Sequence, residues 1–176
     1  MSEATGNINA ACEATISPVV SLSDDEFLDL YGGLFDHSPW IVERAVLRRP
    51  FDDLHTALMQ VVADATDDER LNLIRAHPEL AGKAAVDHTL TEASGAEQAS
   101  AGLDRLTPRE FEHFLALNAA YREKIGFPFI ICVRLTNKAG ILAAMYRRLD
   151  NSRESEIRTA IHEIGDIVRL RIGAMA

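Results

Sequence analysis

Helix-start signals recur along this chain at short intervals. In three of them a serine or threonine is followed three residues later by glutamate, at the spacing of a capping box: Ser23 and Glu26, Thr66 and Glu69, Thr107 and Glu110. Such a pair satisfies two free backbone N–H groups at a helix amino terminus. Apolar residues at helical spacing follow each pair, and the inward faces are expected to include Leu30 and Leu115. The sequence therefore predicts amphipathic helices that bury one face.

Other signals divide the rest of the chain. Further helices are predicted where Ser38 caps Pro39, over residues 54–62, near Ser94, and over residues 138–149 and 154–172. The helix that begins at Thr66 should end near His77, because Pro78 disfavours helical geometry in the residue before it. The run GFPFIICV, residues 126–133, is expected to be extended or irregular, since proline interrupts it and no second strand is available to pair with it.

These elements predict an all-α fold, a single compact domain of about seven or eight helices. The domain is expected to span residues 22–176 after a flexible leader at residues 1–21, which is small, polar and without period. The composition, with 47% hydrophobic and 26% charged residues, is typical of a soluble globular protein.

The charge and the apolar runs exclude some partners. A net charge of -9 argues against nucleic acid, because binding to phosphates needs a basic face. The longest apolar run, residues 127–133, is too short to cross a bilayer, so no membrane partner is expected. The two cysteines do not suggest a disulfide framework, and the first residues lack the pattern of a secretion signal. The expected location is the cytoplasm.

The stretch from residue 75 to residue 103 concentrates groups that can transfer protons. It places His77 before a proline, and then Ser94, Glu97 and Gln98 at the expected start of a helix. An imidazole, a carboxylate and an amide in one place are sufficient for proton transfer without a metal. Each also has a structural alternative, because a histidine can cap carbonyls at a helix end and Ser94 with Glu97 can form a capping box.

Three more polar residues fall within apolar patterns. Arg171 continues the inward stripe of the last helix, where it is either a snorkelling side chain or a clamp for a carboxylate. Arg134 directly follows the apolar run and raises the same question. Asn118 lies on the inward face of the long helix, so it is either a structural hydrogen-bonding residue or part of a site.

Metal and cofactor motifs are missing from the sequence. None of the histidines forms the pair, four residues apart with a carboxylate, that marks a zinc-binding helix: His37, His55, His77, His88, His113, His162. The one metal site that the sequence leaves open is an ion bound jointly by His77 and His88. The chain also has no nucleophile elbow, phosphate loop or dinucleotide fingerprint. The sequence thus shows no recognisable metal-binding or cofactor-binding motif.

Six blocks in the same order carry a family resemblance. They are LYGGLFDHSPWIVERA, RRPF, LIRAHPELAGKA, LTEASGAEQASAGL, LNAAYREKIGFPFIICVR and EI-x-x-IVRLRI, spread over residues 22–172. Together they resemble the 2-oxo-4-hydroxy-4-carboxy-5-ureidoimidazoline (OHCU) decarboxylases of urate breakdown. Two departures, Asp36 and Ile125, are not expected to touch the chemistry.

The resemblance implies an all-helical homodimer that needs no metal or organic cofactor and converts a small ureidoimidazoline to (S)-allantoin. It implies that His77 and Glu97 are catalytic. It also implies a set of substrate-binding residues, with the arginine of the final helix as the weakest match: Pro78, Ser94, Gln98, Phe129, Ile130, Ile131, Val133, Arg171.

Two other functions remain open on the residues alone. The chain can be a helical interaction module, in which the polar cluster consists only of caps and buried hydrogen-bonding residues. It can also be a metal-dependent ureide hydrolase, which predicts zinc or manganese in the purified protein.

Overall fold

The computed structural model describes residues 21–82 and 90–175. This part of the chain forms eight α-helices and one short 3-10 helix: α2 (Asp24–Tyr31), α3 (Trp40–Val46), α4 (Leu54–Asp64), α5 (Asp67–Ala76), α7 (Glu92–Ser100), α8 (Pro108–Ile125), η1 (Val133–Leu135), α9 (Lys138–Arg148) and α10 (Arg153–Gly173). It contains no strand, so the all-α prediction is confirmed. Nearly all of the expected leader, residues 1–21, and His88 lie outside the described residues, and the division at residue 22 stays a prediction.

The three predicted capping boxes are present at the starts of α2, α5 and α8. The α5 helix ends with His77 in an extended conformation, as Pro78 dictates. The α8 helix ends at Gly126, whose φ of 90° is accessible to glycine at little cost. No helix in the described ranges has the length and apolar character needed to cross a membrane.

The predicted capping residues were wrong at the starts of α7 and α3. The α7 helix begins at Glu92, and the Thr91 side chain accepts the backbone N–H of Ser94, so Ser94 and Glu97 lie inside the helix and form no capping box. The α3 helix begins at Trp40 after Pro39, without a side-chain cap, so Ser38 does not play the predicted role.

The predicted inward faces were wrong at two leucines. Leu30 on α2 is 47% exposed and Leu115 on α8 is 39% exposed, while their neighbours Tyr31 and Phe114 are buried. All four residues were expected on the inward faces, and the buried stripe of each helix is narrower than the spacing predicted.

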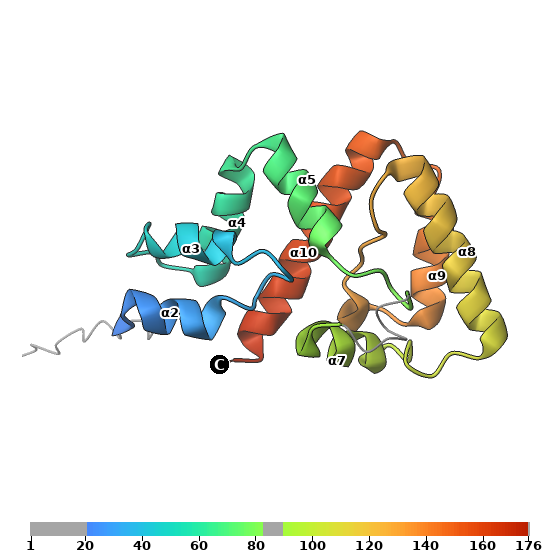
Figure 1. The fold of residues 1–176 in the computed structure, drawn as a ribbon, viewed down its shortest axis with the longest axis horizontal. Helices are drawn as coiled ribbons and strands as arrows, with labels where there is room; N and C mark the ends of the chain where they lie inside the picture. The colour runs from blue at the N-terminus through green and yellow to red at the C-terminus, as the bar shows by residue number, and fades with distance from the viewer. Residues whose placement is uncertain (1–20, 83–89, 176) are drawn as a thin grey trace, which may run out of the picture.

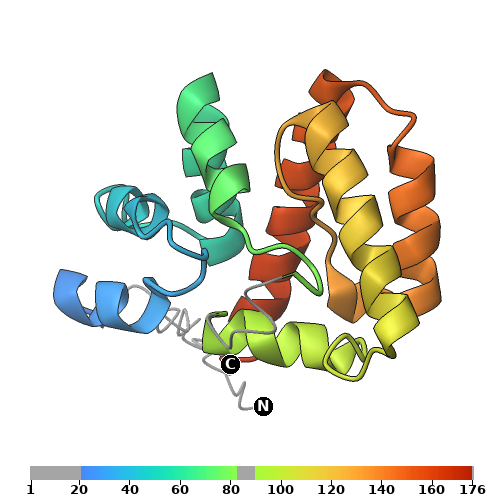
Figure 2. The same cartoon turned by 45° about the vertical axis from the view of Figure 1, so that its right-hand side comes forward.

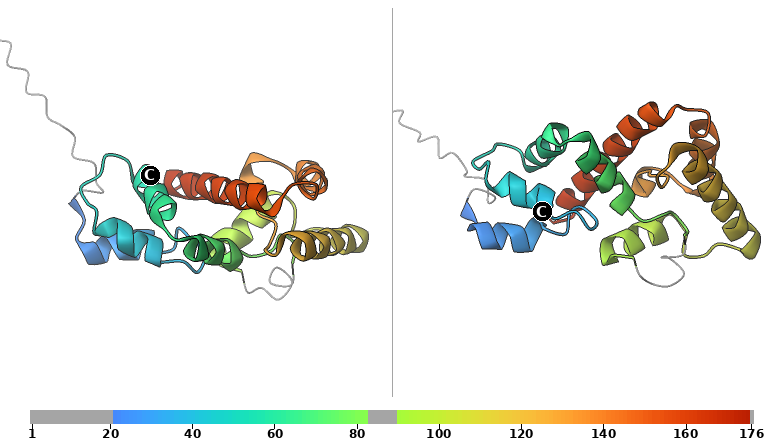
Figure 3. Two further views of the ribbon diagram at one scale, coloured as in Figure 1. Left: turned by 90° about the horizontal axis from the view of Figure 1, so that it is seen from above. Right: turned by 45° about the horizontal axis from the view of Figure 1, so that its top comes forward.

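The α10 helix runs through the middle of the molecule (Figure 1). The α2, α3 and α4 helices lie on one side of it, and α8 and α9 lie on the other. Figure 2 shows the irregular segment that follows α8 descending along α10 towards η1, while α7 crosses near one end of α10. Figure 3 shows α5 lying beside the same central helix. This arrangement brings the ends of α5, α7 and α10 together.

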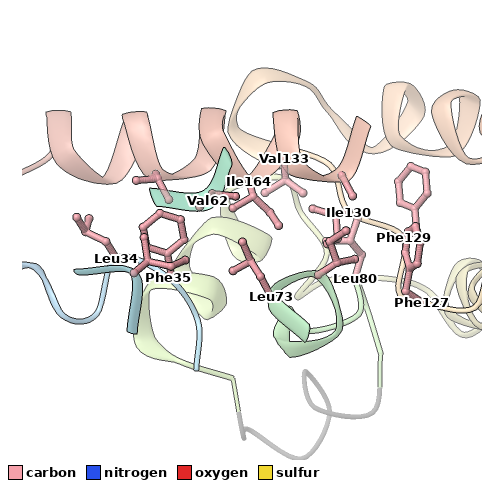
Figure 4. Packing of buried hydrophobic residues seen from close by; sticks show 14 of the residues in the cluster. Leu34, Phe35, Val62, Leu73, Leu80, Phe127, Phe129, Ile130, Val133 and Ile164 are labelled. Atoms are coloured by element: carbon pink, nitrogen blue, oxygen red, sulfur yellow. The ribbon is translucent and has the colours of Figure 1, made fainter. Parts of the chain in front are cut away.

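Buried apolar side chains fill the space beside α10 (Figure 4). Leu34 and Phe35 come from the link between α2 and α3, Leu73 comes from α5, and Ile130 comes from the segment after α8. The Phe129 ring is also buried and meets the Tyr121 ring edge-on at 5.1 Å. The predicted irregular segment is therefore part of the core, which fixes it without strand pairing.

The buried ion pair of Arg148 and Glu156 helps to hold the segment that follows α8. Arg148 donates from Nε to Glu156 (2.9 Å) and from Nη1 to the Ile130 carbonyl (2.8 Å), and its guanidinium lies 4.3 Å from the centre of the Phe129 ring. Glu163 on α10 accepts the Cys132 backbone N–H at 2.8 Å. Because both side chains bind backbone atoms of residues 130–132, they set the path of the chain there.

Substitution of Glu156 measures how much the Arg148–Glu156 pair contributes to the stability of the fold. Glu156 is fully buried, and Glu156→Ala leaves Arg148 with only the more distant carboxylate of Glu163, at 3.9 Å. We therefore expect the free energy of unfolding to fall by about 3–5 kcal/mol. Urea denaturation followed by circular dichroism measures this. Glu154→Ala on the same helix, where the side chain is 85% exposed, is the matched control and should lose much less. Equal losses would contradict a stabilising role for the buried pair.

Candidate active site

One cavity lies where α5, α7, α10 and the segment after α8 meet. It has about 460 Å³ of empty space, including the part open to solvent. All ten residues that the resemblance implicated line it, together with Asp36, Leu80, Cys132, Arg134 and Ile167. His77 and Glu97, twenty positions apart in sequence, therefore face a single cavity. Their chemical roles stay predictions.

Arg171 is the centre of the polar network in this cavity. Its Nε and Nη2 donate to the two oxygens of Glu97, each at 2.8 Å, in a bidentate pair. Its Nη2 also lies 3.1 Å from Asp36 Oδ2 and 3.2 Å from Ser94 Oγ, and its Nη1 donates to the Leu34 carbonyl at 3.0 Å. Burying an unpaired guanidinium costs several kcal/mol, so these partners explain why this buried charge is tolerated.

Asp36 belongs to the site, and the expectation that it stays away from the chemistry was wrong. Its side chain is buried and accepts hydrogen bonds from the hydroxyls of Thr91 (2.6 Å) and Ser94 (3.0 Å). Burial alone would raise the pKa of Asp36, but Arg171 and these hydroxyls outweigh it, so the pKa is lowered and the carboxylate is ionised. The only signal in the sequence was its place in the first matching block, because its partners are distant along the chain.

His77 presents a neutral imidazole to the cavity. Its Nδ1 lies 3.2 Å from the Leu73 carbonyl, which can only accept, so Nδ1 carries the proton and Nε2 carries the lone pair. Nε2 lies 3.8 Å from Asp36 Oδ2, too far for a hydrogen bond. Burial lowers the pKa of His77, and the nearby Asp36 charge offsets this only in part. The ring is thus a base, with an anion placed to stabilise it once protonated.

The polar atoms of Ser94 and Gln98 are engaged mainly with the protein. The Ser94 hydroxyl lies between Asp36 and Arg171. The Gln98 amide accepts the Ala81 N–H at 2.9 Å and donates to the Glu79 carbonyl at 3.2 Å, and its second N–H has no partner among residues 21–82 and 90–175. Both residues line the cavity, and both also fix the chain around it.

Asn118 lies outside the cavity lining. Its amide donates to the Leu80 carbonyl at 2.8 Å, so the structure favours the structural alternative for this residue. Cys132 does line the cavity, where burial raises the pKa of its thiol and keeps it protonated. No group of three or more possible metal ligands occurs among residues 21–82 and 90–175.

The fold and the cavity together define a class, an all-helical protein whose buried acid, base and arginine meet in one small-molecule site. Residues 20–173 match the family model described as OHCU decarboxylase. The chain is 45% identical to the 2-oxo-4-hydroxy-4-carboxy-5-ureidoimidazoline decarboxylase of Haloferax volcanii, over 91% of this chain and 95% of that protein. It is 35% identical to the decarboxylase of the same name from Mus musculus, over 88% of each chain. The chain belongs to the OHCU decarboxylase family.

Solved structures agree on the fold. The crystal structure of (S)-allantoin synthase matches with a TM-score of 0.71 at 28% identity, over 89% of this chain. This chain spans about half of that protein, since the match covers 52% of it. A structure of OHCU decarboxylase in the presence of (S)-allantoin matches with a TM-score of 0.63 at 18% identity, over 98% of that chain. The family resemblance of the sequence blocks is confirmed.

The protonation of His77 can be measured directly. We expect ¹⁵N NMR, with the signal assigned by its loss in His77→Gln, to give a pKa below the ordinary value of about 6.5. In Asp36→Asn the pKa should fall further, because the removed negative charge favours the imidazolium.

The same lowered pKa has a consequence for stability. Because the unfolded chain binds the His77 proton more readily, the contribution of neutral His77 to the free energy of unfolding is complete above about pH 6.5 and is lost as the pH falls towards the pKa of the folded state.

If NMR gave a wild-type His77 pKa at or above the ordinary value, the neutral, buried base described above would be ruled out.

Proposed function

We propose that this chain removes carbon dioxide from OHCU to give (S)-allantoin in urate degradation, which makes it a carboxy-lyase. The observation that carries the proposal is the neutral His77 imidazole in the same cavity as Glu97, with Asp36 behind it. Membership in the OHCU decarboxylase family supports the choice of substrate.

The substrate explains why this chain's acid and base groups are sufficient. OHCU carries a hydroxyl and a carboxylate on one ring carbon, next to a ring imine. When the bond to the carboxylate breaks, the electron pair passes into the ring and is absorbed by the imine. The substrate therefore supplies its own electron sink, and the proposal includes no metal and no organic cofactor.

Proton transfer is the part of the reaction left to the protein. His77 Nε2 would take the hydroxyl proton as carbon dioxide leaves, and the Asp36 carboxylate would stabilise the resulting imidazolium. Two protons are then needed, one on the ring nitrogen that received the electron pair and one on the neighbouring ring carbon. His77 would return the hydroxyl proton and Glu97 would relay one from solvent; the proton on carbon, delivered by either residue to one face of the enol-like intermediate, would set the (S) configuration. The bidentate pair with Arg171 holds Glu97 in one orientation for this role.

The rest of the cavity would hold the substrate in place. Pro78 and residues 129–133 supply a wall with backbone polar groups, and Gln98 offers one N–H that is unpaired within the described part of the chain. Ser94 contributes through the network of Asp36 and Arg171. These contacts would fix which ring face receives the proton.

Two further properties come from the family resemblance. We propose a homodimer, which sedimentation equilibrium can measure, and a cytoplasmic location.

Substitution of the two acid–base residues tests the proposed reaction. We expect His77→Ala and Glu97→Ala to lower the rate of (S)-allantoin formation by about 10²–10⁴-fold, which is the usual contribution of a positioned acid or base. Urate is oxidised in situ and circular dichroism then follows turnover and product handedness together. Arg109→Gln, on an exposed residue outside the cavity, is the control and should retain wild-type activity.

The result would count against the acid–base roles if correctly folded His77→Ala still formed (S)-allantoin at the wild-type rate. A folded wild-type protein that left the spontaneous decay unchanged would reject the decarboxylase proposal and favour the interaction module.

A chelator distinguishes the decarboxylase from a metal-dependent ureide hydrolase. Arg171 already neutralises much of the charge on Asp36 and Glu97, so a cation would have to displace it to bind there. We expect EDTA to leave the rate unchanged and metal analysis of the purified protein to find no stoichiometric zinc or manganese. Loss of activity with EDTA, restored by zinc or manganese, would support the hydrolase instead.

A further inference from the structure

The buried arginine of the site has most of its donors engaged already, and among the described residues one N–H of Nη1 is without a partner. All three nitrogens of Arg171 are hydrogen-bonded, to Glu97, Asp36, Ser94 and the Leu34 carbonyl. Two of those partners are carboxylates. An incoming carboxylate would either displace part of the bidentate pair or bind beside it, and in both cases it would meet the negative charges of Asp36 and Glu97.

The charge balance of the inner cavity is unfavourable for an anion. Asp36 and Glu97 each carry one negative charge against the single positive charge of Arg171, and neutral His77 adds none. The inner cavity is therefore net negative. A substrate that itself carries a carboxylate needs a positive charge elsewhere in the lining.

Arg134 is the other cation in the cavity lining. Arg134 is exposed, and the only hydrogen bond of its guanidinium to the described residues is a long one, 3.5 Å, to the Leu170 carbonyl near the end of α10. No carboxylate in the described part of the chain lies within ion-pair distance of it. A neighbouring hollow shares Glu97, Arg134 and Arg171 with the cavity, so Arg134 stands where the two spaces adjoin.

We propose that Arg134 recognises the substrate carboxylate, while Arg171 positions Glu97 and Asp36. This inference rests on the proposed function, since it assigns one group of that substrate to one residue. It places the carboxylate at the outer side of the cavity and the hydroxyl towards His77. The two groups sit on one ring carbon, so this orientation also selects the ring face that the base reaches.

Because Arg134 is exposed, it can bind the substrate carboxylate without holding it too tightly to leave as carbon dioxide. A tight, desolvated ion pair with the carboxylate would stabilise the ground state and would have to be broken as carbon dioxide forms. A solvent-exposed pair is weak, and it acts mainly on capture and orientation. The effect of Arg134 is therefore expected on KM more than on kcat.

The test compares an anionic ligand with a neutral one. Arg134→Gln should raise the KM for OHCU by roughly two- to fivefold, the range expected for an exposed charge, and change kcat by less than about twofold. The inhibition constant of (S)-allantoin, which is neutral and lacks the carboxylate, should stay within about twofold of wild type, because no exposed ion pair is lost. Arg134→Lys should return KM close to the wild-type value, and Arg134→Glu should raise it further.

Salt and a matched surface variant complete the design. The difference in KM between wild type and Arg134→Gln should shrink in 0.5 M NaCl, because exposed charges are screened. Arg109→Gln changes the net charge equally at an exposed residue outside the cavity and should leave KM unchanged.

Two results would overturn the inference. One is an unchanged KM in folded Arg134→Gln and Arg134→Glu. The other is an equal rise of KM and of the (S)-allantoin inhibition constant. That result would mean that Arg134 contributes to the shape of the cavity and does not recognise the negative charge of the carboxylate. Either result leaves the wild-type activity intact, so it counts against Arg134 and not against the proposed decarboxylation.

Discussion

The burial of one guanidinium between two carboxylates is the interaction on which the site depends. Arg171 comes from α10, Glu97 from α7 and Asp36 from the link between α2 and α3, so the network joins three parts of the chain that are far apart in sequence. Each charge is tolerated in the interior only because the others are present. The site and the packing of these helices are therefore one structure, and the cavity forms only when the helices are assembled.

The irregular segment after α8 shows how a chain without regular hydrogen bonds becomes a rigid wall. Phe129 and Ile130 anchor it in the core, and Arg148 and Glu163 bind its backbone. The partners of the segment are side chains from α9 and α10, since no neighbouring strand is present in the described ranges. This leaves its inner edge available to line the cavity, which a paired strand would do less easily.

Much of the fold was predictable because its signals are local. The capping boxes, Pro78 and Gly126 act within a few residues, and the structure confirms them. The start of α7 was misplaced, since Thr91 and Ser94 both fit a cap; in the structure Thr91 accepts the Ser94 N–H, and the Ser94 hydroxyl is bonded to the distant Asp36 instead. The residues of the cavity came from the family resemblance. The place of Asp36 was missed because it depends on partners 55 and more positions away.

The hydrogen bond from His77 to the Leu73 carbonyl ties the imidazole to the last turn of α5. A helix turns by about 100° per residue, so one residue inserted or deleted between Asp67 and Ala76 would swing the ring out of the cavity while leaving the helix itself intact. The need to direct the Nε2 lone pair of His77 into the cavity therefore fixes the length of α5. Related chains should vary in length at the links between helices and keep this helix in register.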